Sequence, residues 1–140
     1  MNIVVIDAQG GGIGKQLVTS IKQSIPDAYV MAVGTNPAAT QAMMKAGADI
    51  AATGENSVRV ACRKADVIVG PIGIVIADSM LGEITPEMAT AVAQSEARLI
   101  LIPFSHQNRM IVGMPELPLG RLIQEAVREL VRVRDEMAEE

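Results

Sequence analysis

The chain has 140 residues, a formal net charge of −4 and a single cysteine, Cys62. This length suits one domain with a substantial core. The acidic balance disfavours a nucleic-acid partner, and the lone cysteine excludes a disulfide within the chain. Apolar residues make up 49% of the sequence, which argues against disorder. Because no apolar stretch approaches the roughly 20 residues of a membrane span, and no leader precedes the first apolar segment, we expect a cytoplasmic protein with no membrane partner.

The first predicted element is an apolar strand at residues 2–6, of the kind buried on both faces of a parallel sheet. A glycine cluster follows, and residues 13–24 then place apolar side chains on one stripe of a helix. Clustered glycines let a bound group approach the backbone, and a helix start offers free N–H groups to a phosphate. The candidate ligand-binding residues here are Asp7, Gln9, Gly10, Gly11, Gly12, Ile13 and Gly14.

Residues 28–33 form the second predicted strand, and a helix follows that ends at about residue 46. Asn36 suits the cap of that helix and Pro37 its first position. At the end of this strand NAD sites place an acid that holds the ribose hydroxyls, and NADP sites use a nearby arginine. The sequence has neither, which weighs against a dehydrogenase. Thr35 and Asn36 could hydrogen-bond a ribose, although capping alone explains Asn36.

Three further strands are predicted at residues 49–52, 66–70 and 98–103. Helices are expected at about 55–64, 85–95 and 118–137, the last being about 30 Å long. Residues 72–81 are apolar almost all round, so we expect a helix buried in the domain or in an oligomer interface. Residues 109–113 could form a sixth strand, joined to the fifth by a hairpin through residues 105–108.

Strands that alternate with helices at this spacing predict βαβ units and a parallel sheet. Right-handed crossovers favour the strand order 3-2-1-4-5, with a possible antiparallel edge strand. We therefore expect a single-domain, Rossmann-like α/β sandwich of three layers over residues 1–140, ending in a long helix. Ligands of such sheets bind beyond the carboxyl ends of the strands. That edge adds these candidates: Thr35, Asn36, Gly54, Glu55, Asn56, Gly70, Pro71, Ile72 and Gly73.

The glycine loop fits no single nucleotide-binding fingerprint. Gly10 and Gly12 match the dinucleotide motif, but Lys15 stands at its third glycine position. Gly14 and Lys15 match a P-loop, but Gln16 replaces the hydroxyl residue that would hold magnesium. We favour binding of a phosphate or dinucleotide, with NAD(P) or another nucleotide as the ligand. The alternative is that the glycines serve only tight turning and helix–sheet packing.

Candidate catalytic residues are few, and we assign none. His106 is the only histidine and is interpreted as a loop residue rather than a site residue. Asp7 could hold loop N–H groups or a metal, and we favour the first role. Asp78 interrupts an apolar segment, so it is either a site candidate or a solvent-facing residue. Cys62 is interpreted as a core residue, and no metal-ligand spacing is present.

Four motifs together resemble a small bacterial family of unknown function with a Rossmann-like fold. These are Asp7-Ala8-Gln9-Gly10-Gly11-Gly12-Ile13-Gly14-Lys15, Ala32-Val33-Gly34-Thr35-Asn36, Ala52-Thr53-Gly54-Glu55-Asn56 and Gly70-Pro71-Ile72-Gly73. The resemblance covers nearly all of the chain. It implies the fold but no reaction, because that family has no established activity. More distantly, the chain is similar to NAD(P)-binding Rossmann proteins, which is an analogy of fold.

Three functions remain open from the sequence. The first is a protein that binds a nucleotide or dinucleotide and need not carry out chemistry. The second is an NAD(P)-dependent oxidoreductase subunit whose substrate domain is missing or supplied by a partner. The third is a non-enzymatic scaffold or regulator, in which residues 72–81 and the last helix pair across a two-fold axis. A homodimer or higher homo-oligomer is expected.

Overall fold

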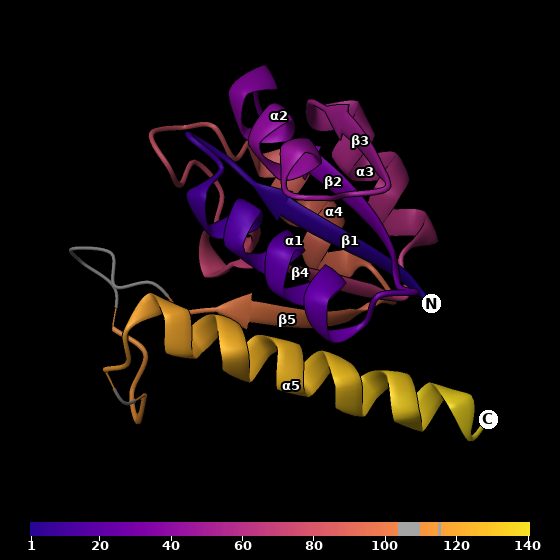
Figure 1. Cartoon of the computed structure of the whole chain (residues 1–140). Helices are drawn as coiled ribbons and strands as arrows, with labels where there is room; N and C mark the ends of the chain where they lie inside the picture. Colours follow the sequence, from indigo (N-terminus) through magenta and orange to yellow (C-terminus); the bar gives the residue numbers. More distant parts are fainter. Residues whose placement is uncertain (104–109, 115) are drawn as a thin grey trace.

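The computed structural model describes residues 1–103, 110–114 and 116–140. Its centre is one sheet of five parallel strands, ordered β3-β2-β1-β4-β5 (Figure 1). The predicted fold class and strand order are therefore confirmed. The strands are β1 (Asn2–Asp7), β2 (Tyr29–Gly34), β3 (Ile50–Thr53), β4 (Val67–Pro71) and β5 (Arg98–Ile102).

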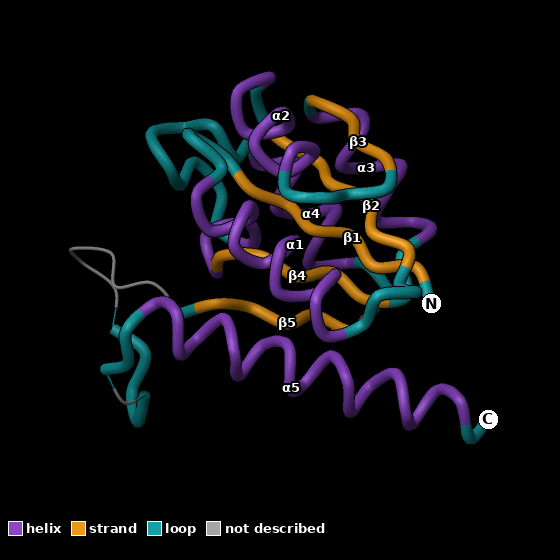
Figure 2. The backbone as a smooth tube through the Cα atoms, viewed as in Figure 1, coloured by secondary structure: helices purple, strands orange, loops and turns teal. Residues whose placement is uncertain are grey.

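Helices cover both faces of the sheet, as Figure 2 shows. One face packs against α1, α2 and α5, and the other packs against α3 and α4. This arrangement follows from right-handed crossovers that run outward in both directions from the central strand β1. The helices are α1 (Gly12–Ser24), α2 (Pro37–Lys45), α3 (Glu55–Lys64), α4 (Pro86–Gln94) and α5 (Leu119–Ala138), with one 3₁₀ turn, η1 (Ile72–Val75).

Side chains of β1 alternate between the two cores, as the pleat of a strand requires. Ile3 and Val5 join the core under α1, whereas Val4 and Ile6 join the core under α3 and α4. All four are buried. This double burial explains why the segment is continuously apolar rather than alternating.

The apolar stripe of α5 is buried within its own chain. Ile123, Val127 and Leu130 belong to the same core as α1 and the sheet. That stripe is therefore not free for the predicted pairing with residues 72–81 of a second copy.

The predicted helix caps are confirmed. The Asn36 side chain accepts a hydrogen bond from the amide of Ala39 at 2.9 Å. The Thr85 hydroxyl accepts one from the amide of Met88 at 3.1 Å. In both helices proline occupies the first turn, where it has no amide to leave unpaired.

The helix predicted at residues 72–81 is wrong. The chain there makes the short turn η1 and then a series of turns before α4 begins. Asp78, Met80, Leu81 and Gly82 have φ values of 64°, 55°, 60° and 86°. Residues in this left-handed region cannot continue a right-handed helix.

The sixth strand predicted at residues 109–113 is also wrong for the part that the structure describes. Residues 110 and 111 have no regular structure, and residues 112 and 113 form a turn. Met110 and Val112 are 93% and 95% exposed, so neither packs as a strand residue would. Residues 105–109, including His106, lie outside the described residues.

Both ends of the chain lie at the amino edge of the sheet. In Figure 1 the start of β1 and the end of α5 are on the right, while the strand arrows point left. None of the helices that the structure describes is long and apolar enough to cross a membrane.

Candidate functional site

Asp7 organises the turn between β1 and α1. Its side chain is buried. One carboxylate oxygen accepts a hydrogen bond from the amide of Ala8 at 2.8 Å, and the other accepts one from the amide of Gly14 at 2.7 Å. Asp7 therefore satisfies one of the free donors at the start of α1. The predicted role of Asp7 in holding loop N–H groups is confirmed.

The pKa of Asp7 lies above its ordinary value of 3.8. Burial raises this pKa most, because it disfavours the charged form. The amides of Gly14 and Ala8 lower it, and the negative charge of nearby Glu83 raises it again. Two carboxyl groups therefore lie close together at this edge of the sheet.

Packing explains several of the candidate glycines. A Cβ atom at Gly70 would lie 2.5 Å from the carbonyl oxygen of Ile6, and one at Gly14 would lie 2.9 Å from Cβ of Asp7. Gly11 needs its left-handed φ of 72°. At Gly73 the nearest atom is the terminal Cε of Met80 at 2.7 Å, which a flexible side chain can withdraw. The alternative interpretation thus accounts for Gly11, Gly14 and Gly70.

Gly10 and Gly12 are different. A Cβ atom at either position would meet nothing within 4 Å, and neither residue has a positive φ. Among the described residues, no group accepts a hydrogen bond from either amide. At these two positions the backbone at the start of α1 is uncovered, and we name it the glycine strip. Neither packing nor backbone conformation requires glycine there.

Glu83 is the site residue that sequence analysis missed. Its Oε1 atom accepts hydrogen bonds from the amide of Gln9 at 2.8 Å, the hydroxyl of Thr35 at 2.7 Å and the side-chain amide of Asn36 at 2.8 Å. An acid therefore does lie at the end of β2, but it comes from 48 residues further along the chain. No motif in the sequence marks Glu83, because its position depends on the unpredicted turns before it.

The pKa of Glu83 lies below its ordinary value of 4.5. Partial burial raises the pKa, but the hydrogen bonds from Gln9, Thr35 and Asn36 together outweigh that effect. Glu83 is therefore ionised at neutral pH. Because the charge of Glu83 acts on Asp7, the protonation of the two carboxyl groups is coupled.

Residues 76–84, here named the crossing segment, carry Glu83 over the carboxyl edge of the sheet. The segment leaves η1 and reaches the loop after β1 and the start of α2 through the Glu83 hydrogen bonds. Directly after it, the Thr85 hydroxyl donates to Glu55 at the start of α3, at 2.5 Å. Figure 1 shows the segment in rose at the upper left, beside the end of β1.

The other candidate residues are spread along the same edge. Glu55 is paired with Thr85 as described, and Asn56 is exposed beside it. Pro71 is buried at the end of β4, whereas Ile72 and Ile13 are half-buried. The structure thus brings together the loop after β1, Thr35 and Asn36, while the start of α3 forms a separate contact.

The structure places two further residues that the sequence analysis discussed, Asp78 and Cys62. Asp78 is exposed in a turn, so its solvent-facing interpretation holds. Cys62 is buried in the core under α3, as predicted, and burial raises the pKa of its thiol to about 11. A thiol with that pKa stays protonated at neutral pH and is a poor nucleophile.

Within the described parts of the chain, no three His, Cys, Asp or Glu residues gather as metal ligands would.

An open groove of about 1020 Å³ lies between α3 and α4 at the opposite, amino edge of the sheet. Its lining includes Arg59, Arg63 and Arg98, but also Glu87 and Glu96. These charges of both signs favour no single class of ligand. Because ligands of open parallel sheets bind beyond the carboxyl ends of the strands, we place the candidate site at that edge and not in the groove.

The fold and this edge together define a parallel α/β protein in which open backbone and a fixed carboxylate lie beyond the strand ends. The chain belongs to the family described as Domain of unknown function (DUF3842), which matches residues 2–135. The expected resemblance to a family of unknown function is confirmed. The more distant similarity to NAD(P)-binding proteins stays a prediction. No curated protein matches the chain.

Several solved structures are similar to the chain, among them the following two. One is a dodecameric FMN-dependent UbiX-like decarboxylase from Escherichia coli O157:H7, which is 18% identical, with a TM-score of 0.48 over 95% of this chain and 76% of that chain. The other is AibC, which is 20% identical, with a TM-score of 0.47 over 94% of this chain and 41% of that chain. At these scores no property of either protein is carried over.

The Glu83 contacts predict a dependence of stability on pH. Because the folded-state pKa of Glu83 is lowered, its contribution is present above the unfolded pKa and is lost as the pH falls through the folded pKa. Glu83→Gln should therefore reduce the free energy of unfolding by about 1 kcal/mol at neutral pH, and by less at about pH 3. Urea unfolding of both proteins at the two pH values measures this. An equal loss at both would contradict it.

Proposed function

We propose that the protein binds a nucleotide at the carboxyl edge of its sheet, between the start of α1 and the end of β2. The observation that supports this most is the open backbone at Gly10 and Gly12. A Cβ atom at either would meet nothing within 4 Å. Glycine has no other evident reason to occupy these two positions.

The start of α1 suits the phosphate of such a ligand. A helix start carries partial positive charge, and its first amides point toward the solvent. In the described structure Asp7 takes up the amide of Gly14, but the amide of Gly12 has no protein acceptor. A phosphate oxygen at Gly10 and Gly12 would accept the hydrogen bonds that the protein does not make.

Charge also limits where the phosphate can sit. Glu83 is ionised and holds the donors of Gln9, Thr35 and Asn36. A second anion beside that carboxylate is disfavoured. Among the described residues, the amides of Gly10 and Gly12 still have no acceptor, so we assign the phosphate to these amides and the neutral sugar to the Glu83 side nearer β2.

The other two functions stay predictions. An NAD(P)-dependent oxidoreductase subunit would use the same edge, with the chemistry supplied by the cofactor. A homo-oligomeric scaffold is favoured by exposed apolar side chains, since Leu81, Met110 and Val112 are each more than 90% exposed. Side chains of this kind are common at protein interfaces, and self-association is compatible with nucleotide binding.

Substitution of the two open glycines tests the proposal. Calorimetric titration of the protein with ADP and with NAD⁺ measures affinity directly. Gly10→Ala combined with Gly12→Ala should weaken binding at least about tenfold, since two methyl groups would block a close approach to the backbone. The fold should be unaffected, because the added atoms meet no neighbour.

Gly120→Ala is the matched control. Gly120 is also a glycine at a helix start with open space around its Cβ position, but it lies in α5. Its substitution should leave affinity unchanged. If the unsubstituted protein binds neither ligand at millimolar concentration, or the double variant binds as well as the control, the proposal is wrong.

A further inference from the structure

Glu83 presents one occupied and one free oxygen at the candidate site. Oε1 accepts three hydrogen bonds, from Gln9, Thr35 and Asn36. Within the part of the chain that the structure describes, Oε2 accepts no hydrogen bond and no cation pairs with the carboxylate. The three donors come from the β1–α1 loop and the end of β2, so they fix the carboxylate relative to both.

Such a carboxylate is preorganised to accept hydrogen bonds from a ligand. Ionised carboxylates are acceptors only, and a charged acceptor makes stronger bonds than a neutral one. A ligand that offers two neighbouring hydroxyl donors matches this chemistry. A ligand that offers a phosphate does not, because it brings a second negative charge.

Glu83 lies next to the glycine strip. Gln9, whose amide donates to Oε1, directly precedes Gly10. Thr35 and Asn36 lie where α/β nucleotide sites hold the ribose by an acid at the end of the second strand. In this chain the acid at that place is supplied by the crossing segment instead of by β2.

We propose that the free oxygen of Glu83 accepts hydrogen bonds from the ribose 2′- and 3′-hydroxyls of the bound nucleotide, and so selects nucleotides without a 2′-phosphate. This rests on the proposed nucleotide site. Glu83 is a specificity-determining residue in this assignment, and the crossing segment is the part of the fold that positions it.

The test uses three ligands that differ only at the 2′ position: ADP, 2′-deoxy-ADP and ADP that carries a 2′-phosphate. Titration calorimetry of the full chain should show ADP binding about tenfold to a hundredfold more tightly than either other ligand. The loss of a hydroxyl removes a charged hydrogen bond, and the added phosphate introduces repulsion.

Glu83→Gln then separates specificity from stability. Its side-chain oxygen can still accept from Gln9, Thr35 and Asn36, but its NH₂ group now faces the ligand as a donor. The variant should bind ADP about tenfold less tightly and the 2′-phosphorylated ligand more tightly than the unsubstituted protein does. Thermal unfolding without ligand confirms that the variant is folded.

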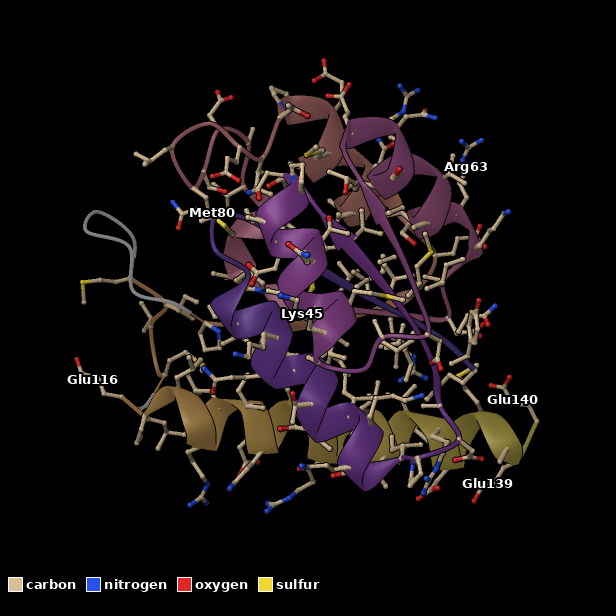
Figure 3. The ribbon with its side chains drawn as sticks, turned by 45° about the horizontal axis from the view of Figure 1, so that its top comes forward. Lys45, Arg63, Met80, Glu116, Glu139 and Glu140 are labelled. Carbon is tan, nitrogen blue, oxygen red and sulfur yellow. The ribbon has the colours of Figure 1, made fainter. Side chains whose placement is uncertain are left out.

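Glu139→Gln is the matched control, because Glu139 is exposed at the end of α5. Figure 3 shows Glu139 on the opposite side of the molecule from Met80 of the crossing segment. This variant should retain the full preference for ADP.

The outcomes distinguish the two proposals. If the unsubstituted protein does not bind ADP, both the nucleotide site and the role of Glu83 are overturned. If ADP binds and the glycine double variant weakens it, but 2′-deoxy-ADP binds equally well, only the role of Glu83 is overturned. If Glu83→Gln binds ADP more tightly, the carboxylate blocks the site rather than reading the sugar, and this inference is also wrong.

Discussion

Gly70→Ala is expected to lower the free energy of unfolding by about 3 kcal/mol. The added Cβ atom would lie 2.5 Å from the carbonyl oxygen of Ile6 and 3.0 Å from Cδ1 of Ile74. Ile6 belongs to β1, which pairs with β4 at the centre of the sheet. Because the closest clash is with backbone rather than a flexible side chain, the two central strands must separate to relieve it.

Urea unfolding of the purified variant measures this effect, with Gly12→Ala as the control. Gly12 is a candidate glycine at the same edge, but its Cβ position is open. The control should unfold within about 0.5 kcal/mol of the unsubstituted protein. A loss below about 1 kcal/mol for Gly70→Ala would show that the strands adjust easily, and packing would then not explain this glycine.

Asp7→Ala is expected to destabilise the protein by a similar amount, about 3 kcal/mol. The substitution leaves the amides of Ala8 and Gly14 without the acceptor that they share in the folded state. Unpaired donors in a buried setting cost about 1–3 kcal/mol each. Amide hydrogen exchange should accelerate first at Gly14, where α1 loses the partner of its first turn.

The size of this loss should fall as the pH rises. The folded-state pKa of Asp7 is raised above 3.8, so its contribution is full below the unfolded pKa and declines as the pH rises through the folded pKa. The difference in unfolding free energy between the two proteins should therefore be larger near pH 4 than near pH 7. A difference that grows with pH would contradict the assignment of burial as the dominant effect.

The strand order and the helix boundaries could be predicted because their causes are local. The apolar run of β1 signals burial on both faces, and capping by Asn36 and Thr85 requires only residues three positions away. The right-handed crossover rule then leaves few possible sheet orders. Each of these predictions depends on neighbours in sequence and on general geometry.

The crossing segment could not be predicted, because residues 72–81 are apolar almost all round and were therefore interpreted as a buried helix. Ile74 and Ile84 are buried, whereas Leu81 between them is 96% exposed. The backbone turns that separate them use left-handed conformations at residues other than glycine. Such conformations are uncommon for L-residues, so the sequence carries no local sign of them.

Glu83 was missed for the same reason. A carboxylate after Gly82 has many possible positions, and only the turns of the crossing segment bring it to Thr35 and Asn36. The sequence correctly showed that β2 ends without an acid. It could not show that a distant segment places one there.

The position of both chain ends has a practical consequence for binding measurements. Residues 1 and 140 lie at the amino edge of the sheet, and every group of the candidate site lies at the other edge (Figure 1). A label, affinity tag or sensor surface attached to either end would therefore leave the carboxyl edge facing free solution. Immobilised protein can accordingly be compared with protein in solution without the attachment itself obstructing the ligand.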